Sequence, residues 1–299
     1  MDWKGLLLGE LWLTFDILFG LFLGFAILKS GIADRLMKGL IPHLRRAGIG
    51  PVLGMALTVS LGSAKAGAAY IASALDNDRI SEKEAKWGTL ALSFPAYLHR
   101  WPSTMVMSAS MAGLSGAIFG AILLLRSAAR FILIIWILKR GGCAETAVEE
   151  EPSAGSAREI KFNRKLLRTL PLAWCFFAAA WMLVPWAEEL IKHWLLAGKM
   201  LPLAALTVAA ASIAHVSAAL ALAGGSLAHG DLTIAQAVFA LLLGNSLGIV
   251  TRLFRQNAGY YFGLFSRGTA QWLLLWNFIT TAGFALLSIA LAAIPLFFI

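Results

Sequence analysis

Residues 47–75 form a stretch of 29 residues that carries a single charge, on Lys65. Basic residues gather on both sides of it, at 29–46 and at 76–86. Because lysine and arginine accumulate in the cytoplasmic loops of membrane proteins, both flanks are expected on the cytoplasmic side of a bilayer. One crossing takes about 20 residues, so this stretch is too short to cross and return. It is therefore expected to enter and leave on the same side, as a re-entrant helical hairpin with Lys65 near its turn.

The composition is that of a polytopic α-helical membrane protein. Hydrophobic residues make up 59% of the 299 residues and charged residues only 14%, and several apolar runs exceed the roughly 18 residues typical of a spanning helix. The run at 6–28 is interpreted as a retained span, because it carries Glu10 and Asp16 and lacks a small-residue cleavage site. The net charge of +9 fits positively charged cytoplasmic loops, so no nucleic-acid partner is expected.

The second half of the chain repeats the first. "ALTV" at 56–59 returns at 205–208, and 78–100 aligns with 230–252 at an offset of 152. Each half has a leading span, a hairpin and two further spans, and three crossings invert the second copy. The sequence therefore predicts an all-α polytopic membrane protein of two inverted-topology repeats, each with three spanning helices and one re-entrant helical hairpin.

Four basic groups orient this arrangement. They lie at 29–46, 76–86, 139–168 and 252–267 and hold 18 of the 25 Lys and Arg residues. The charge bias predicts a prokaryotic cytoplasmic (inner) membrane protein with both termini extracytoplasmic. The predicted domains are the first transmembrane repeat at 1–140 with its hairpin at about 50–75, a cytoplasmic linker at 141–165, and the second inverted repeat at 166–299 with its hairpin at about 201–227.

The two expected hairpin tips carry the first candidate site residues, Lys65 with Ser63 and, in the second copy, His215. A charge inside a bilayer costs roughly 2.5–3.5 kcal/mol on insertion scales, so it usually faces a partner or a wet path. Two tips meeting near the midplane would offer helix N-termini, a lysine and a histidine to an anion. Alternatively, Lys65 only ties down its turn by bonding to carbonyl groups, and His215 is a hydrogen-bonded core residue.

Further candidates lie on the helices that follow the hairpins. "SFPAYLHRWPS" (93–103) is expected to break its helix at Pro95 and at Pro102. Arg126 and Arg130 share one helical face, with Asp16 as an available counter-ion; for the arginines, an anion site and a structural or interfacial role both stay open. The full set of candidate substrate-binding residues is Lys65, Ser63, Ser93, Tyr97, Arg100, Arg126, Arg130, His215, Asn245 and Arg252.

Motifs of soluble enzymes are not found in the sequence. It contains no P-loop, no dinucleotide-binding glycine motif and no HExxH motif. Cys143 and Cys175 suggest neither a disulfide nor a metal site. The embedded polar groups are mostly cationic, whereas a membrane hydrolase would offer paired carboxylates or a His/Asp set. The expectation is a protein that is not an enzyme and needs no cofactor or metal.

Residues 48–125 resemble the nucleoside-recognition, or Gate, domain. The resemblance rests on the small-residue tip "GSAKAG" (62–67), the polar turn "NDRISEKEA" (77–85) and the "SFP" that follows at 93–95. Similar regions occur in bacterial ferrous-iron transporters, spore-maturation membrane proteins and concentrative nucleoside transporters. Residues 201–270 match more weakly, with His215 at the tip and "GNS" in place of "SFP". The resemblance implies the architecture and a nucleoside- or nucleotide-like solute, and no cysteine-lined iron gate is present.

These observations favour a membrane transporter of a polar, anionic small solute, with a midplane site between two re-entrant hairpins. A flippase for a phosphate-bearing polyprenyl lipid is a second hypothesis, since paired hairpins with embedded basic groups suit a head group whose tail stays in lipid. A non-transporting scaffold or gate subunit is a third. The expected partners are a small-molecule or lipid-phosphate substrate and membrane lipids; homo-oligomerisation is left open.

Overall fold

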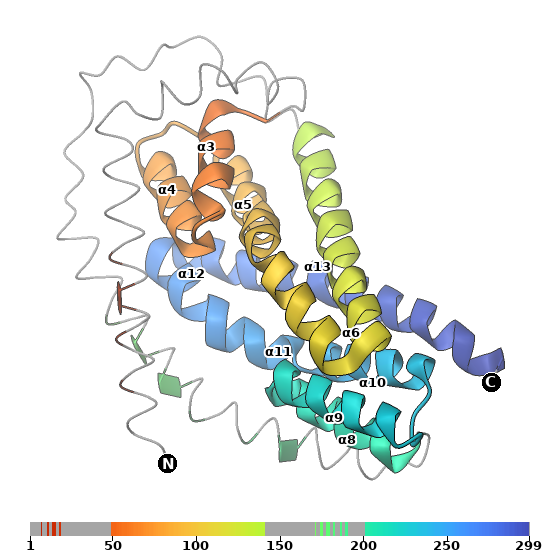
Figure 1. Ribbon diagram of the computed structural model, residues 1–299. Coiled ribbons are helices and arrows are strands. Elements are labelled where there is room, and N and C mark those ends of the chain that lie inside the picture. Colours follow the sequence, from red (N-terminus) through yellow and green to blue (C-terminus); the bar gives the residue numbers. More distant parts are fainter. Residues whose placement is uncertain are drawn as a thin grey trace. The chain divides into compact units, whose positions relative to one another are not determined.

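The computed structural model describes residues 49–140 and 201–298, with single helical positions between residues 7 and 18 and between 171 and 190. Within these residues every element that it assigns is a helix (Figure 1). The linker 141–165, Asp16, and most of the expected leading spans at 6–28 and 166–186 lie outside the described residues.

The described helices form two series, one on either side of residues 141–200. In chain order they are α3 (Pro51–Ser60), α4 (Ala64–Asp76), α5 (Glu82–Ala91), α6 (Ser93–Arg140), α8 (Leu203–Ala214), α9 (Val216–Ala228), α10 (Ile234–Leu247), α11 (Ile249–Arg252), the π-helix η1 (Leu253–Ala258), α12 (Gly259–Leu264), α13 (Arg267–Ala293) and the 3-10 helix η2 (Ile294–Phe298).

Hydroxyl side chains begin several of these helices. Ser63 Oγ accepts the N–H of Ala66 at the start of α4, and Ser81 Oγ accepts the N–H of Glu84 at the start of α5. Thr233 begins α10 with a reciprocal capping box. Such caps satisfy N–H groups that have no partner within the helix, which explains where the chain starts each helix.

The first three helices of the two series begin at positions that differ by one constant offset. Helices α8, α9 and α10 each begin 152 residues after α3, α4 and α5, at 203, 216 and 234 compared with 51, 64 and 82. The offset is the one at which the two halves of the sequence align. Short helices of the same kind therefore recur in the same order at the same spacing.

The turn after the second helix of each series also recurs at this offset. Asp78 has φ 56 and Gly230 has φ 79, both in the left-handed region that few residues other than glycine adopt. The N–H of Asp78 donates to the carbonyl of Leu75 at 3.1 Å, and the N–H of Gly230 donates to that of Leu227 at 3.2 Å. The repeat therefore extends to the backbone conformation of the turns.

Helix α6 folds back on itself at Gly113, which has φ 56 (Figure 1). Trp101 Nε1 donates to the carbonyl of Gly120 across the two arms at 3.2 Å. A Cβ on Gly116 would lie 2.6 Å from the carbonyl carbon of Ser108, so the arms touch through a glycine. Small residues at helix contacts in membrane proteins allow such an approach.

The predicted breaks at Pro95 and Pro102 are wrong in position. The chain turns at Leu92, between α5 and α6, and Pro95 then lies in the first turn of α6, where a missing N–H costs little. The helix continues through Pro102. The break occurs instead at Gly113, where the chain reverses and only glycine readily adopts the required φ.

Long apolar helices indicate a membrane protein. Among the described residues, Glu82–Arg140 and Arg267–Leu296 are long and apolar enough to cross a bilayer, and Ile234–Leu247 with Ile249–Leu264 would be a third span with a bend of 44°. The helices of the two hairpins have only 10 to 13 residues. At about 1.5 Å per residue they fall short of a hydrocarbon core of about 30 Å.

The chain divides into two compact units, and each draws on both series. The first unit comprises residues 1–99, 131–178 and 257–275, and the second comprises 100–130, 179–256 and 276–299. In the first unit α4 packs against α12. In the second unit α9 packs against the turn of α6, and a Cβ on Gly224 would lie 3.1 Å from the carbonyl carbon of Met111. Each unit thus joins the hairpin of one series to the helix break of the other.

Fully buried alanines lie in the packed helices of both units. Ala56 and Ala68 in the first unit are fully buried, as are Ala209, Ala219 and Ala240 in the second. Lipid tails are as apolar as leucine, so helices in a membrane associate through close packing of small side chains rather than through burial alone. The alanines therefore let the short hairpin helices approach the helix that follows them.

Candidate functional site

Three of the predicted substrate-binding residues lie together in the second unit. Arg126 Nη2, from the second arm of α6, donates to Asn245 Oδ1 at 3.0 Å. Arg252 Nη2, from α11, donates to the main-chain oxygen of the same asparagine. Asn245 is only 7% exposed. We call these three residues the arginine cluster.

The local chain geometry explains how Arg252 reaches back to Asn245. Helix α10 ends at Gly248, and its last carbonyl groups have no partner further along the helix. A Cβ on Gly248 would lie 2.6 Å from Arg252 Nη1 and 2.8 Å from the carbonyl oxygen of Ile213. The glycine therefore leaves the space through which the arginine returns. A cation at this end of a helix also interacts favourably with the helix dipole.

A second set of contacts in the same unit surrounds Arg130, one helical turn after Arg126. Arg130 Nε donates to Thr280 Oγ1 at 3.0 Å, and its Nη2 donates to Asn277 Oδ1 at 2.6 Å. Asn277 and Thr280 are each 7% exposed. The sequence reasoning missed both residues, although polar side chains in the middle of an apolar helix were a signal for them.

The acceptors of these hydrogen bonds carry no formal charge. The acceptors described above for the three arginines are amide, hydroxyl and main-chain oxygens. Burying a polar or charged group is costly unless it is hydrogen-bonded, and these bonds meet part of that cost. They also orient the guanidinium groups. Arg126 and Arg130, at i and i+4, also lie on one side of their helix.

Two more of the predicted residues, Lys65 and His215, lie at the hairpin tips. Lys65 is half-buried at the second position of α4, two residues after the cap Ser63. The N-terminal end of a helix carries a partial positive charge. Together with the lysine, it favours an anion close to this turn. His215 is exposed and forms the extended link between α8 and α9. Lys65 belongs to the first unit and His215 to the second, so the meeting of the two tips stays a prediction.

Ser93, Tyr97 and Arg100 follow the first hairpin. Ser93 is exposed, and its Oγ donates to the carbonyl of Leu90 at 3.0 Å. Tyr97 is half-buried and Arg100 is exposed. Ser93 and Tyr97 belong to the first unit, so a site that combines them with the arginine cluster also stays a prediction.

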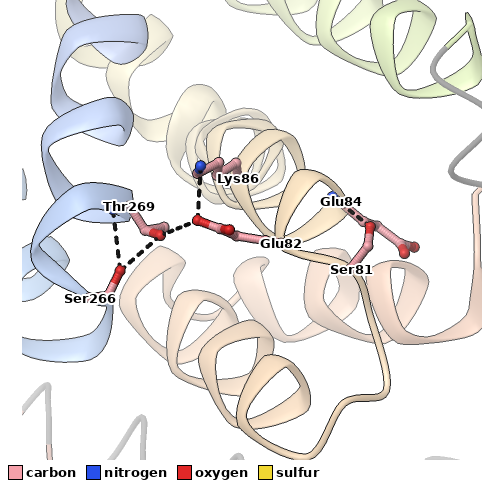
Figure 2. A network of polar contacts seen from close by, with 6 residues as sticks. All are labelled: Ser81, Glu82, Glu84, Lys86, Ser266 and Thr269. Atoms are coloured by element: carbon pink, nitrogen blue, oxygen red, sulfur yellow. Dashed lines mark hydrogen bonds and ion pairs between the residues drawn. The ribbon is translucent and has the colours of Figure 1, made fainter.

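Figure 2 shows a polar network in the first unit that sequence reasoning did not find. Glu82 Oε1 lies 2.9 Å from Lys86 Nζ and accepts a hydrogen bond from Thr269 Oγ1 at 2.8 Å. Ser266 Oγ in turn donates to Thr269 Oγ1 at 3.1 Å. We call these four residues the α5–α13 network, because they connect the first turns of those two helices. The "SRGT" at 266–269 is typical of a helix cap. It does not indicate the contact with Glu82, which lies 187 residues from Thr269.

Compared with protein-family models, curated proteins and solved structures, the chain gives no match. The resemblance to the nucleoside-recognition domain therefore stays a prediction from the residues that carry it. The case for a function comes from the arginine cluster and from the repeated helices.

Proposed function

We propose that the chain is a transporter that moves a small anionic solute across a prokaryotic cytoplasmic membrane, with the arginine cluster as part of its binding site. The observation that carries the proposal is the convergence of Arg126 and Arg252 on buried Asn245. Arginine presents a planar fork of N–H donors that matches a carboxylate or phosphate group. In apolar surroundings such a charge-assisted bond is stronger than in water.

The proposed architecture is two inverted repeats, each with three crossings and one re-entrant hairpin. The recurrence of helix starts at an offset of 152 supports the repeat. The shortness of α3 and α4, at 10 and 13 residues, supports hairpins that do not cross. Inverted repeats with broken helices are typical of secondary transporters, whose sites lie where the helices break. Asn245 and Arg252 flank such a break, between α10 and α11.

The solute proposed is a nucleotide-like anion, because the arginine cluster suits a phosphate and the sequence resembles the nucleoside-recognition domain. A phosphate on a polyprenyl lipid would offer the same group to the same arginines. The two substrates differ in their tails, so the experiment includes both.

The test is a thermal-shift measurement on the purified full-length protein in detergent. The probes are uridine, uridine monophosphate, inorganic phosphate and farnesyl phosphate. We expect uridine monophosphate to raise the melting temperature, since a ligand at 100 times its Kd stabilises a protein by about 2.7 kcal/mol. Arg126→Gln should lose this response, because glutamine keeps polarity but removes the charge.

Arg267→Ala is the matched control, because Arg267 is an exposed arginine on the first turn of α13. It should keep the wild-type response. An equal response to uridine would contradict the anion site, and a response to farnesyl phosphate alone would favour the flippase. If no probe stabilises the protein, and proteoliposomes take up none of them, the scaffold hypothesis would replace transport.

A further inference from the structure

The α5–α13 network has an equivalent place in the second unit, given by the offset of 152. None of its four residues keeps its polarity there. Glu82 corresponds to Ile234, Lys86 to Val238, Ser266 to Leu114 and Thr269 to Ala117. The two places are equivalent by the offset of the helix starts, but they differ in every side chain that makes the network.

In the first unit the network holds two helix starts together. Ser266 caps α13 and donates to Thr269, which donates to Glu82, which also pairs with Lys86 (Figure 2). The Glu82 carboxylate thus lies at the first turn of α13, where the helix dipole favours a negative charge. The same two helices also meet through the rings of Trp87 and Trp272, which pack edge to face with centroids 5.0 Å apart.

In the second unit the equivalent place is open. The starts of α10 and of the second arm of α6 border a depression of about 440 Å³. Leu114 is 63% exposed and Ile234 is 43% exposed, whereas Thr269, in the network of the first unit, is 2% exposed. The residues that line the depression are Met111, Ala112, Gly113, Leu114, Ser115, Gly224, Leu227, Ala228 and Ile234.

We infer that the α5–α13 network is a latch, closed in this structure, and that the depression at Ile234 is the equivalent position in its open state. This inference rests on the proposed function, because an inverted-repeat transporter alternates between states in which equivalent parts of its two repeats open and close in turn. Opening the latch then accompanies closing of the depression. Glu82 is 60% exposed, so water can replace the Thr269 hydroxyl as its hydrogen-bond partner when the latch opens.

The latch is tested by the accessibility of single cysteines, with no ligand present. Cys143 and Cys175 are first replaced by serine, because they are the two cysteines of the chain. Ala270→Cys reports on the latch, since Ala270 is 0% exposed beside Thr269. Ala228→Cys reports on the depression, where Ala228 is exposed. The rate of reaction with a water-soluble maleimide is measured on each purified full-length protein.

Thr269→Val removes the donor of the bond between α5 and α13, and Glu82→Ala removes its acceptor. Either is expected to speed labelling of the Ala270→Cys reporter about fivefold, the factor that the loss of one such hydrogen bond would produce. Either should also slow labelling of the Ala228→Cys reporter.

Asp78→Asn is the matched control, because it removes one exposed negative charge four residues before Glu82 and tolerates the same φ. It should leave both rates unchanged. Unchanged rates in Thr269→Val, or faster labelling at position 270 without slower labelling at 228, would overturn the latch.

The arginine cluster is not part of this measurement. The labelling rates are measured without ligand, whereas the anion site is tested by the thermal response to uridine monophosphate. A failure of the anion site and a failure of the latch are therefore separate results.

Discussion

Gly244 lies at a close approach of α10 to α8, one residue before the asparagine of the arginine cluster. A methyl group at this position would overlap the carbonyl oxygen of Ala209 and lie 2.7 Å from Ser212 Cβ. Two carbon atoms in contact need about 3.5 Å or more. In Gly244→Ala, α10 must therefore move away from α8 by roughly 1 Å.

The cost of this movement can be worked out from the contacts it disturbs. Overpacking a well-packed interior typically costs about 1–3 kcal/mol. The bond from Ser212 Oγ to the carbonyl of Leu241, 3.1 Å long and buried, would also stretch, which adds about 1 kcal/mol. A loss of about 3 kcal/mol corresponds to a melting temperature lower by roughly 6–12 °C.

Gly225→Ala is the matched control for this prediction. Nothing lies within 4 Å of a Cβ built on Gly225, which is exposed in α9. Alanine there should be neutral or stabilise by about 0.5–1 kcal/mol, because glycine weakens a helix interior. Both variants are melted in the same detergent by intrinsic tryptophan fluorescence. A Gly244→Ala protein that melts within about 2 °C of the wild type would refute the close approach of α10 to α8.

Two other predictions concern the hairpin and the topology. Lys65→Ala should abolish the thermal response to uridine monophosphate at an unchanged melting temperature. Lys65→Arg should impair this response, because a planar guanidinium must fit between small residues. A lowered melting temperature with unchanged affinity would instead support a lysine that only ties down its turn. An impermeant thiol reagent added to intact cells should leave Cys143 unlabelled, since the positive-inside rule predicts a cytoplasmic linker; labelling from outside would contradict the predicted orientation.

Much of the local structure was predictable because its causes are local. The alignment pairs Ser81 with Thr233 and Glu84 with Gln236, and each pair lies at a helix start, with Gln236 completing a capping box. Such caps join groups three residues apart, so the sequence alone indicates them. The membrane character was likewise predictable, because the apolar composition excludes other classes. The break in α6 was not predictable from its prolines. The helix continues through Pro102, and the chain reverses at Gly113, where the two arms of α6 come into contact through Trp101 and Gly120.

The sequence by itself determined that the chain is helical and apolar, where its short helices begin, and at what offset its halves repeat. These properties follow from side-chain hydropathy and from hydrogen bonds within one turn. Only the tertiary structure decided which oxygens hold the arginines: Asn245 is 119 residues from Arg126, and Asn277 is 147 residues from Arg130. No periodicity links such pairs, because their distance depends on how separate helices pack. The same holds for the bond between Glu82 and Thr269, which required both helix starts to meet.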